Sequence, residues 1–138
     1  MARFPLSGLL RLRQLEKDVA AGDLALANAR LAATADRAAG ERTVLSGIAP
    51  DAVSTASLVA IAAARSATQA ALADLADLAA VHRAEADEAG VRLNRSRADA
   101  LGLEKLEARH RSALDDEELR AEQHLLDEFA SAGRGAAR

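Results

Sequence analysis

Proline occurs only at Pro5 and Pro50, so almost all of this 138-residue chain is free to be helical. A proline inside a helix removes a backbone hydrogen bond and costs about 3 kcal/mol. A single glycine, such as Gly22 or Gly40, costs only about 1 kcal/mol relative to alanine and does not end a helix. Gly47, Pro50 and the residues between them are therefore expected to form the turn between two long helices.

The apolar half of the composition is mostly alanine, and only 1% of the residues are aromatic, namely Phe4 and Phe129. Alanine favours helix but buries little area, and thick cores draw much of their burial from large side chains. A β-sandwich, a barrel and a doubly wound sheet are thereby excluded. The absence of cysteine excludes a disulfide framework and a thiolate metal site.

Apolar residues recur at helical rather than strand spacing, which predicts a coiled-coil seam between the two helices. In the first helix one row contains Leu12, Val19 and Leu26, and another contains Leu24, Leu31, Ala38 and Leu45. In the second helix the rows contain Leu58, Leu72, Ala79, Ala86, Leu93 and Ala100, and Ile61, Leu75, Ala89 and Leu103. The polar residues that interrupt these two rows are Arg65, Thr68, His82, Ser96 and His110.

The expected fold is all-α: a two-helix antiparallel coiled-coil hairpin with a longer, overhanging second helix. A single domain would comprise a helix over about 6–46, a turn over about 47–53, a helix over about 54–131 and a disordered tail over about 132–138. Ser7 is the expected N-cap and Gly47 the expected C-cap glycine. A tight turn would bring Leu6 opposite about Leu93 and leave the chain from about Arg95 onward without a partner helix.

Charge and motifs argue against most other functions. The 18 basic and 21 acidic residues are well mixed, so neither nucleic acid nor an anionic membrane is an expected partner. The longest uncharged apolar run, 58–64, is far short of the roughly 20 residues of a membrane span, so a soluble intracellular protein is expected. Glu107 and His110 have the spacing of one half of a di-metal site, but the chain has no second such pair.

The acidic run 115–118 is expected to be solvated or to face a partner. No nucleophile–base constellation or phosphate-binding loop is present, so no catalytic residue, cofactor or metal is expected, and the protein is not expected to be an enzyme. Two readings remain open on these grounds: a stalk or adaptor in a larger assembly, and a homo-oligomeric structural coiled coil.

From Arg3 and Phe4 through Leu9–Leu10 to Arg13 and Glu16, the chain has an aromatic residue followed by Leu-Leu-x-Leu-Arg. This start resembles that of the FliJ family of flagellar type III export proteins. Near the other end, residues 103–109 resemble a lysine-centred segment of that family. Residues 122–123 and 126–130 resemble its closing segment.

The resemblance implies a non-catalytic cytoplasmic protein at the cytoplasmic face of the inner membrane, held there only through its partners. Those partners would be the hexameric flagellar export ATPase, the cytoplasmic domain of the export gate and the export chaperones. The resemblance also implies a contact region for the ATPase ring, formed by Leu9, Arg11, Leu12, Arg13, Leu15, Lys105, Arg109, Glu122, Gln123, Asp127, Glu128 and Phe129. A docking region for the export gate would comprise Leu58, Val59 and Ala62.

Overall fold

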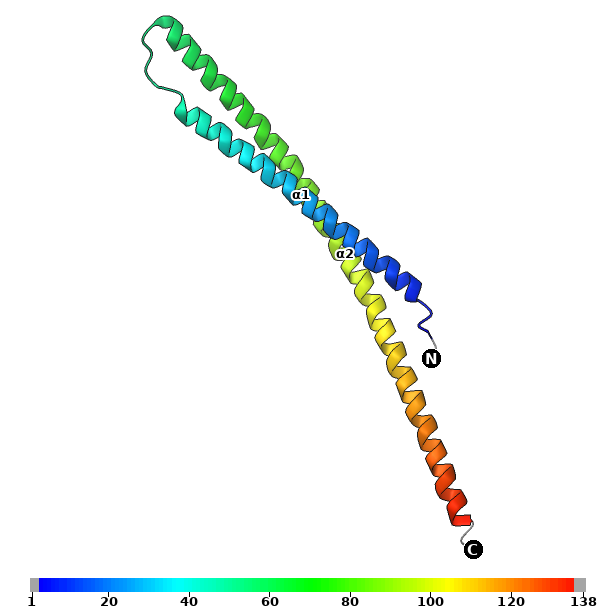
Figure 1. Ribbon diagram of the computed structural model, residues 1–138. Coiled ribbons are helices and arrows are strands. Elements are labelled where there is room, and N and C mark those ends of the chain that lie inside the picture. The colour runs from blue at the N-terminus through cyan, green and yellow to red at the C-terminus, as the bar shows by residue number, and fades with distance from the viewer. Residues whose placement is uncertain (1–2, 136–138) are drawn as a thin grey trace. The chain divides into compact units, whose positions relative to one another are not determined.

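The computed structural model describes residues 3–135, and these form two helices packed as a hairpin (Figure 1). Helix α1 spans Ser7–Gly47 and helix α2 spans Thr55–Gly135. The chain is 92% helical with no strand among the described residues, which confirms the all-α hairpin with a longer second helix. Helix α2 continues to Gly135, past its expected end near residue 131. The rest of the expected tail, 136–138, lies outside the described residues.

The start of α2 is held by a reciprocal pair of serines. The Ser57 backbone N–H donates to Ser54 Oγ at 3.2 Å, and the Ser54 N–H donates to Ser57 Oγ at 2.8 Å. This arrangement satisfies two backbone donors at the helix start, as a capping box does. At the start of α1, the Leu6 carbonyl accepts the first helical bond, from the Leu10 N–H, so Leu6 rather than Ser7 occupies the N-cap position.

The end of α1 depends on Pro50 rather than on a left-handed glycine. No described residue has a positive φ, so Gly47 ends the helix without the expected C-cap conformation. The Ile48 N–H still bonds to the Leu45 carbonyl, at 3.4 Å, in a last tight turn. Pro50 then disfavours helical geometry at the residue before it, which stops further propagation.

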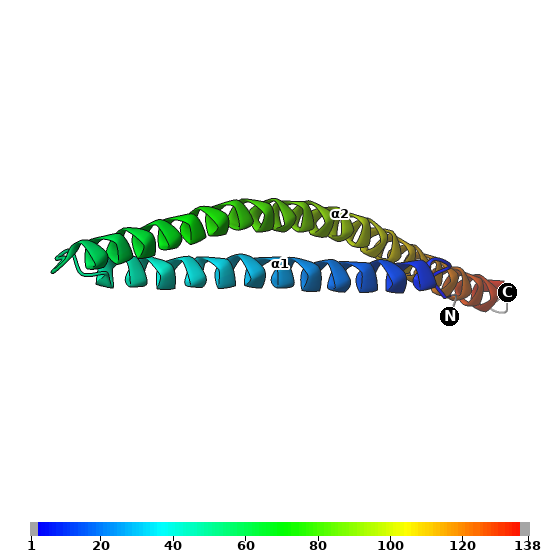
Figure 2. The same ribbon diagram turned by 90° about the horizontal axis from the view of Figure 1, so that it is seen from above.

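The chain divides into two compact units, each of which pairs part of α1 with part of α2. The hairpin unit comprises Asp18–Arg95, including the turn, and the terminal unit comprises Met1–Lys17 with Ser96–Arg138. In the hairpin unit the two helices lie side by side in both views (Figures 1 and 2). Its centre is an alanine cluster in which Ala27 packs with Ala86 and Ala89, and Leu24 lies against the cluster.

Burial along the two helices confirms the Leu24 row of α1, contradicts the Leu12 row, and confirms the two α2 rows except at Leu58. The Leu24–Leu31–Ala38–Leu45 row is half-buried, whereas Val19 is 64% exposed and Leu26 is 53% exposed. The second row of α1 is instead formed by the buried residues Ala20, Ala27 and Thr34. Both apolar rows of α1 have heptad spacing, and packing against α2 selects the one that contains the smaller side chains.

The helix register in the hairpin unit also differs from the expected tight turn. The connecting residues 48–54 separate the helices enough for the first turns of α2 to lie without a partner, so Leu58 and Val59 are exposed. Half-burial of the α2 seam begins at Ser57 and Ile61, and full burial begins at Thr68. Thr68 is tolerated there because its hydroxyl donates to the Ala64 carbonyl at 3.0 Å.

The terminal unit contains the start of α1, packed against the middle of α2. Leu10 and Ala100 are its buried residues, and half-buried positions continue along α2 to Leu114. Arg13 lies near Asp99 and Phe4 lies against His110, so pairing in this unit extends well past the expected limit at Arg95. The segment without a partner helix is 115–132, and every residue in it is exposed.

Helix α2 also contains an 18-residue window long and apolar enough, by length and composition alone, to cross a membrane. The expectation that the chain has no such stretch rested on runs without any charged residue. This window is allowed up to two charged residues. A single window of this kind is weak evidence for a membrane span, and 6% of this window is buried in the structure.

Candidate partner-binding surfaces

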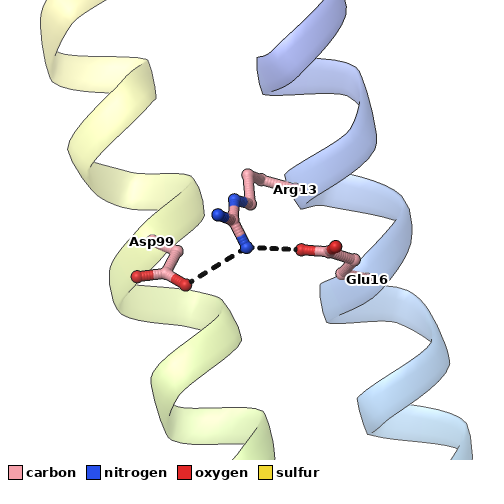
Figure 3. Close-up of polar contacts among 3 residues, drawn as sticks. All are labelled: Arg13, Glu16 and Asp99. Carbon is pink, nitrogen blue, oxygen red and sulfur yellow. Dashed lines mark hydrogen bonds and ion pairs between the residues drawn. The ribbon is translucent and has the colours of Figure 1, made fainter.

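Arg13 is engaged inside the terminal unit. Its Nη1 lies 2.8 Å from Glu16 Oε2, one turn along α1, and 3.6 Å from Asp99 Oδ2 on α2 (Figure 3). All three side chains are partly exposed, so these ion pairs contribute at most about 1 kcal/mol each. Of the residues expected to contact an ATPase ring, Arg13 is therefore the one whose charge has ion-pair partners among the described residues.

The other expected contacts on α1 point away from the seam. Leu9, Leu12 and Leu15 are exposed leucines at successive three-residue steps, and Arg11 is exposed among them. Such steps fall short of a full turn, so the leucines spiral around the helix instead of forming a straight stripe. This part of the terminal unit offers apolar contact over a wide arc of its surface.

On α2, Lys105 and Arg109 are exposed and stand one turn apart on the same face. Neither forms an ion pair within 4.0 Å among the described residues. Leu106 is exposed beside them. The structure thus gathers two free cations and a leucine on the two-helix part of the terminal unit.

Residues 115–132, called the acidic tip below, differ sharply in charge from the two-helix part of the same unit. The acidic tip holds seven acidic residues and one arginine, a formal charge of −6. Residues 3–17 and 96–114 together hold eight basic and four acidic residues, a formal charge of +4. The tip also exposes four large apolar side chains: Leu119, Leu125, Leu126 and Phe129. The expected contacts Glu122, Gln123, Asp127 and Glu128 are all exposed there.

A small cavity at the base of the acidic tip was not foreseen from the sequence. Its volume is about 280 Å³, and its lining includes Phe4, Glu107 and His110. The ring centroids of Phe4 and His110 are 5.6 Å apart. Both residues were visible in the sequence, but only the helix register brings them together.

Glu107 and His110 share this cavity, in keeping with their three-residue spacing on one helix face. Among the described residues no three of His, Cys, Asp and Glu are grouped so that they could hold a metal ion. The side chains of the cavity can supply packing, charge and hydrogen bonds to a bound group.

The expected gate-docking residues lie at the other end of α2, in the hairpin unit. Leu58, Val59 and Ala62 are all exposed, within the first two turns that follow the Ser54–Ser57 cap. They form a small apolar surface on a helix start that has no partner among the described residues. None of the ring-contact residues belongs to this unit.

Comparison with known proteins agrees with the resemblance of the two ends and extends it over the chain. The model of the family described as "FliJ: Flagellar FliJ protein" matches residues 1–135. No curated protein and no solved structure matches the chain. Because the family match covers nearly the whole sequence and the fold is the expected helical hairpin, the chain belongs to the FliJ family and is a flagellar protein with a cytoplasmic, export-related role.

Proposed function

We propose that this protein is a non-catalytic stalk and adaptor that binds the hexameric flagellar export ATPase through its terminal unit. The observation that carries the proposal is the acidic tip, a helix of 18 residues exposed on every side and joined to a basic two-helix part. A single helix of this kind can enter a pore and contact several subunits at once. Its apolar residues add contact area that no other part of the described chain covers.

Coupling to the export gate and to export chaperones completes the proposed role. The exposed residues Leu58, Val59 and Ala62 are the proposed gate contact. They lie in the other compact unit, so the gate contact and the ring contact do not compete for the same residues. Such a division allows one chain to bind two partners, bringing the protein to the cytoplasmic face of the membrane through those partners alone.

The test is stimulation of the cognate export ATPase by purified protein. Charge reversal at Arg11, or at both Asp127 and Glu128, is expected to reduce stimulation at least fivefold, because several weak charged contacts act together and steer association. The same reversals should leave helicity unchanged by circular dichroism, since exposed helix charges contribute only about 0.5 kcal/mol each to folding. Reversal at Arg83 or Asp87, exposed in the hairpin unit, is the matched control and should not alter stimulation.

Arg13 needs a separate design because it pairs with Asp99. Arg13→Glu alone removes an internal ion pair as well as a surface charge. Adding Asp99→Arg restores the ion pair with the two charges exchanged. Any loss of ATPase stimulation that the broken ion pair causes should then be recovered. Loss that persists in the exchanged variant identifies the Arg13 charge itself as a ring contact. Equal loss of stimulation from the Arg83 control and the terminal variants would refute the assignment to the terminal unit.

A further inference from the structure

The cavity at the base of the acidic tip has a composition that neither packing nor the proposed ring contact explains. Phe4 and Leu114 supply an apolar wall, and Glu107, Asp115 and Glu118 supply three carboxylates. On α2 the lining positions are spaced by threes and fours, so they share one face of the helix. At His110 that face is covered by Phe4, which precedes α1, and beyond Leu114 every residue of α2 up to 132 is exposed.

The charges in the cavity are unbalanced. Arg111 is its one permanent cation, and Arg111 Nη2 lies 3.9 Å from Glu107 Oε1. Asp115 and Glu118 have no ion-pair partner within 4.0 Å among the described residues. Two carboxylates beside an aromatic ring therefore have hydrogen-bonding capacity that the described part of the chain does not use.

His110 provides an independent observation at the same place. The ring is half-buried, and its Nε2 is shielded from solvent and has no hydrogen-bond partner among the described residues. A shielded ring nitrogen without a partner is unfavourable by about 1–3 kcal/mol, and native proteins normally satisfy such atoms. A donor that entered the cavity could supply that missing hydrogen bond.

We infer that this cavity is a receptor for an arginine side chain presented by a basic, apolar segment of a partner protein. A guanidinium group stacks on an aromatic ring such as Phe4 and donates to carboxylates in a planar fork. It can also donate to His110 Nε2 in the ring tautomer that carries its proton on Nδ1. The cavity volume of about 280 Å³ is below the roughly 300–1,000 Å³ of small-molecule pockets, which suits one side chain. The −6 charge of the adjoining acidic tip favours a basic partner and disfavours pairing of two such tips.

The inference is independent of the export ATPase and can be tested on the protein alone. The probe is the peptide acetyl-Ala-Leu-Arg-Leu-Ala-amide, titrated into the full chain by NMR with the ring protons of Phe4 and His110 as reporters. The same peptide with citrulline in place of arginine keeps the planar group and removes the charge. Phe129 and His124 do not line the cavity and serve as internal controls for binding elsewhere.

Two double variants distinguish the cavity from general charge attraction. Asp115→Asn with Glu118→Gln removes two carboxylates that line the cavity. Asp116→Asn with Glu117→Gln removes the same charge from the intervening positions, which do not line it. We expect the arginine peptide to shift the Phe4 and His110 resonances saturably and the citrulline peptide not to do so. The first double variant should weaken binding at least fivefold and the second less than twofold.

Other outcomes overturn the inference. If the two double variants weakened binding of the arginine peptide equally, the overall charge of the tip would explain the binding. If the citrulline peptide bound as well as the arginine peptide, apolar contact would explain it. Shifts confined to Phe129 and His124, or no shift at all, would show that arginine does not enter the cavity. Circular dichroism of both double variants checks that each remains helical.

Discussion

Phe4 lies against His110 with ring centroids 5.6 Å apart and the ring planes tilted by 46°. This contact joins the segment before α1 to α2 at the point where the paired part of the terminal unit ends. It closes the cavity on one side and marks the boundary of the acidic tip. Phe4 therefore contributes both to the packing of the terminal unit and to the lining of the cavity.

Replacing Phe4 by alanine should destabilise the protein by about 1–2 kcal/mol, because a half-buried ring loses its contacts. Urea denaturation followed by circular dichroism measures the change. Phe129→Ala is the matched control, since that ring is 75% exposed, and it should change stability by less than about 0.5 kcal/mol. Equal effects of the two substitutions would mean that the Phe4–His110 contact contributes nothing to folding.

The alanine seam should not accept larger side chains. Ala89 is only 2% exposed and packs in the alanine cluster of the hairpin unit, so Ala89→Leu forces the helices apart and should cost about 1–3 kcal/mol. Ala84→Leu, at an exposed position of the same helix, should be nearly neutral. The midpoint of thermal unfolding reports both. A stabilising effect of Ala89→Leu would show that the seam has room for a larger side chain and that the two helices are not in close contact there.

Removing the cap of α2 should cost about 1 kcal/mol. Ser54→Ala deletes the hydroxyl that accepts the Ser57 N–H, and an N-cap serine is typically worth that amount. Hydrogen exchange should show faster opening of the first turn of α2 in this variant. Ser131→Ala removes only a bond to the carbonyl of Glu128 on an exposed helix, so its exchange and stability should match the wild type. Unchanged exchange near Ser57 would contradict the capping role.

The turn between the helices should be convertible into helix. Replacing both Gly47 and Pro50 by alanine removes the two residues that most oppose helix between α1 and α2. One continuous helix can then satisfy its seam only with a second chain, so the variant should form a domain-swapped dimer. Sedimentation velocity at several concentrations measures the change. A variant that stayed monomeric would show that the turn is held by features other than Gly47 and Pro50.

The exposed row of Leu12, Val19 and Leu26 bears on the alternative that this is a homo-oligomeric coiled coil. These residues repeat every seven positions on α1 and are exposed. If they form an interface between copies, Val19→Gln with Leu26→Gln should lower the sedimentation coefficient at high protein concentration. If the wild type is already monomeric at those concentrations, the alternative is refuted. The substitutions should have little effect on folding in either case, because both side chains are outside the seam.

Much of the candidate site could be anticipated in outline but not in detail. The ring-contact residues came from a resemblance between short segments, and the structure finds eleven of the twelve exposed and Arg13 partly engaged with Asp99. The cavity could not be anticipated, because it needs Phe4 opposite His110. That pairing depends on which α2 residue faces the start of the chain in the terminal unit, and the spacing of residues along the sequence does not specify it.

The sequence by itself determined the two helices, their order and the boundary between them. These are local properties: proline placement, alanine content and three-and-four spacing act within a few residues along the chain. Only the tertiary structure decided which of two equally periodic rows of α1 is buried and which α2 residue faces each α1 residue. Helix propensity does not depend on those choices. The close packing of Ala27 against Ala86 and Ala89, by contrast, is possible in one helix register and is lost in the adjacent registers. Within the terminal unit, the pairing of the two chain segments likewise places Phe4 beside His110 and leaves the acidic tip uncovered.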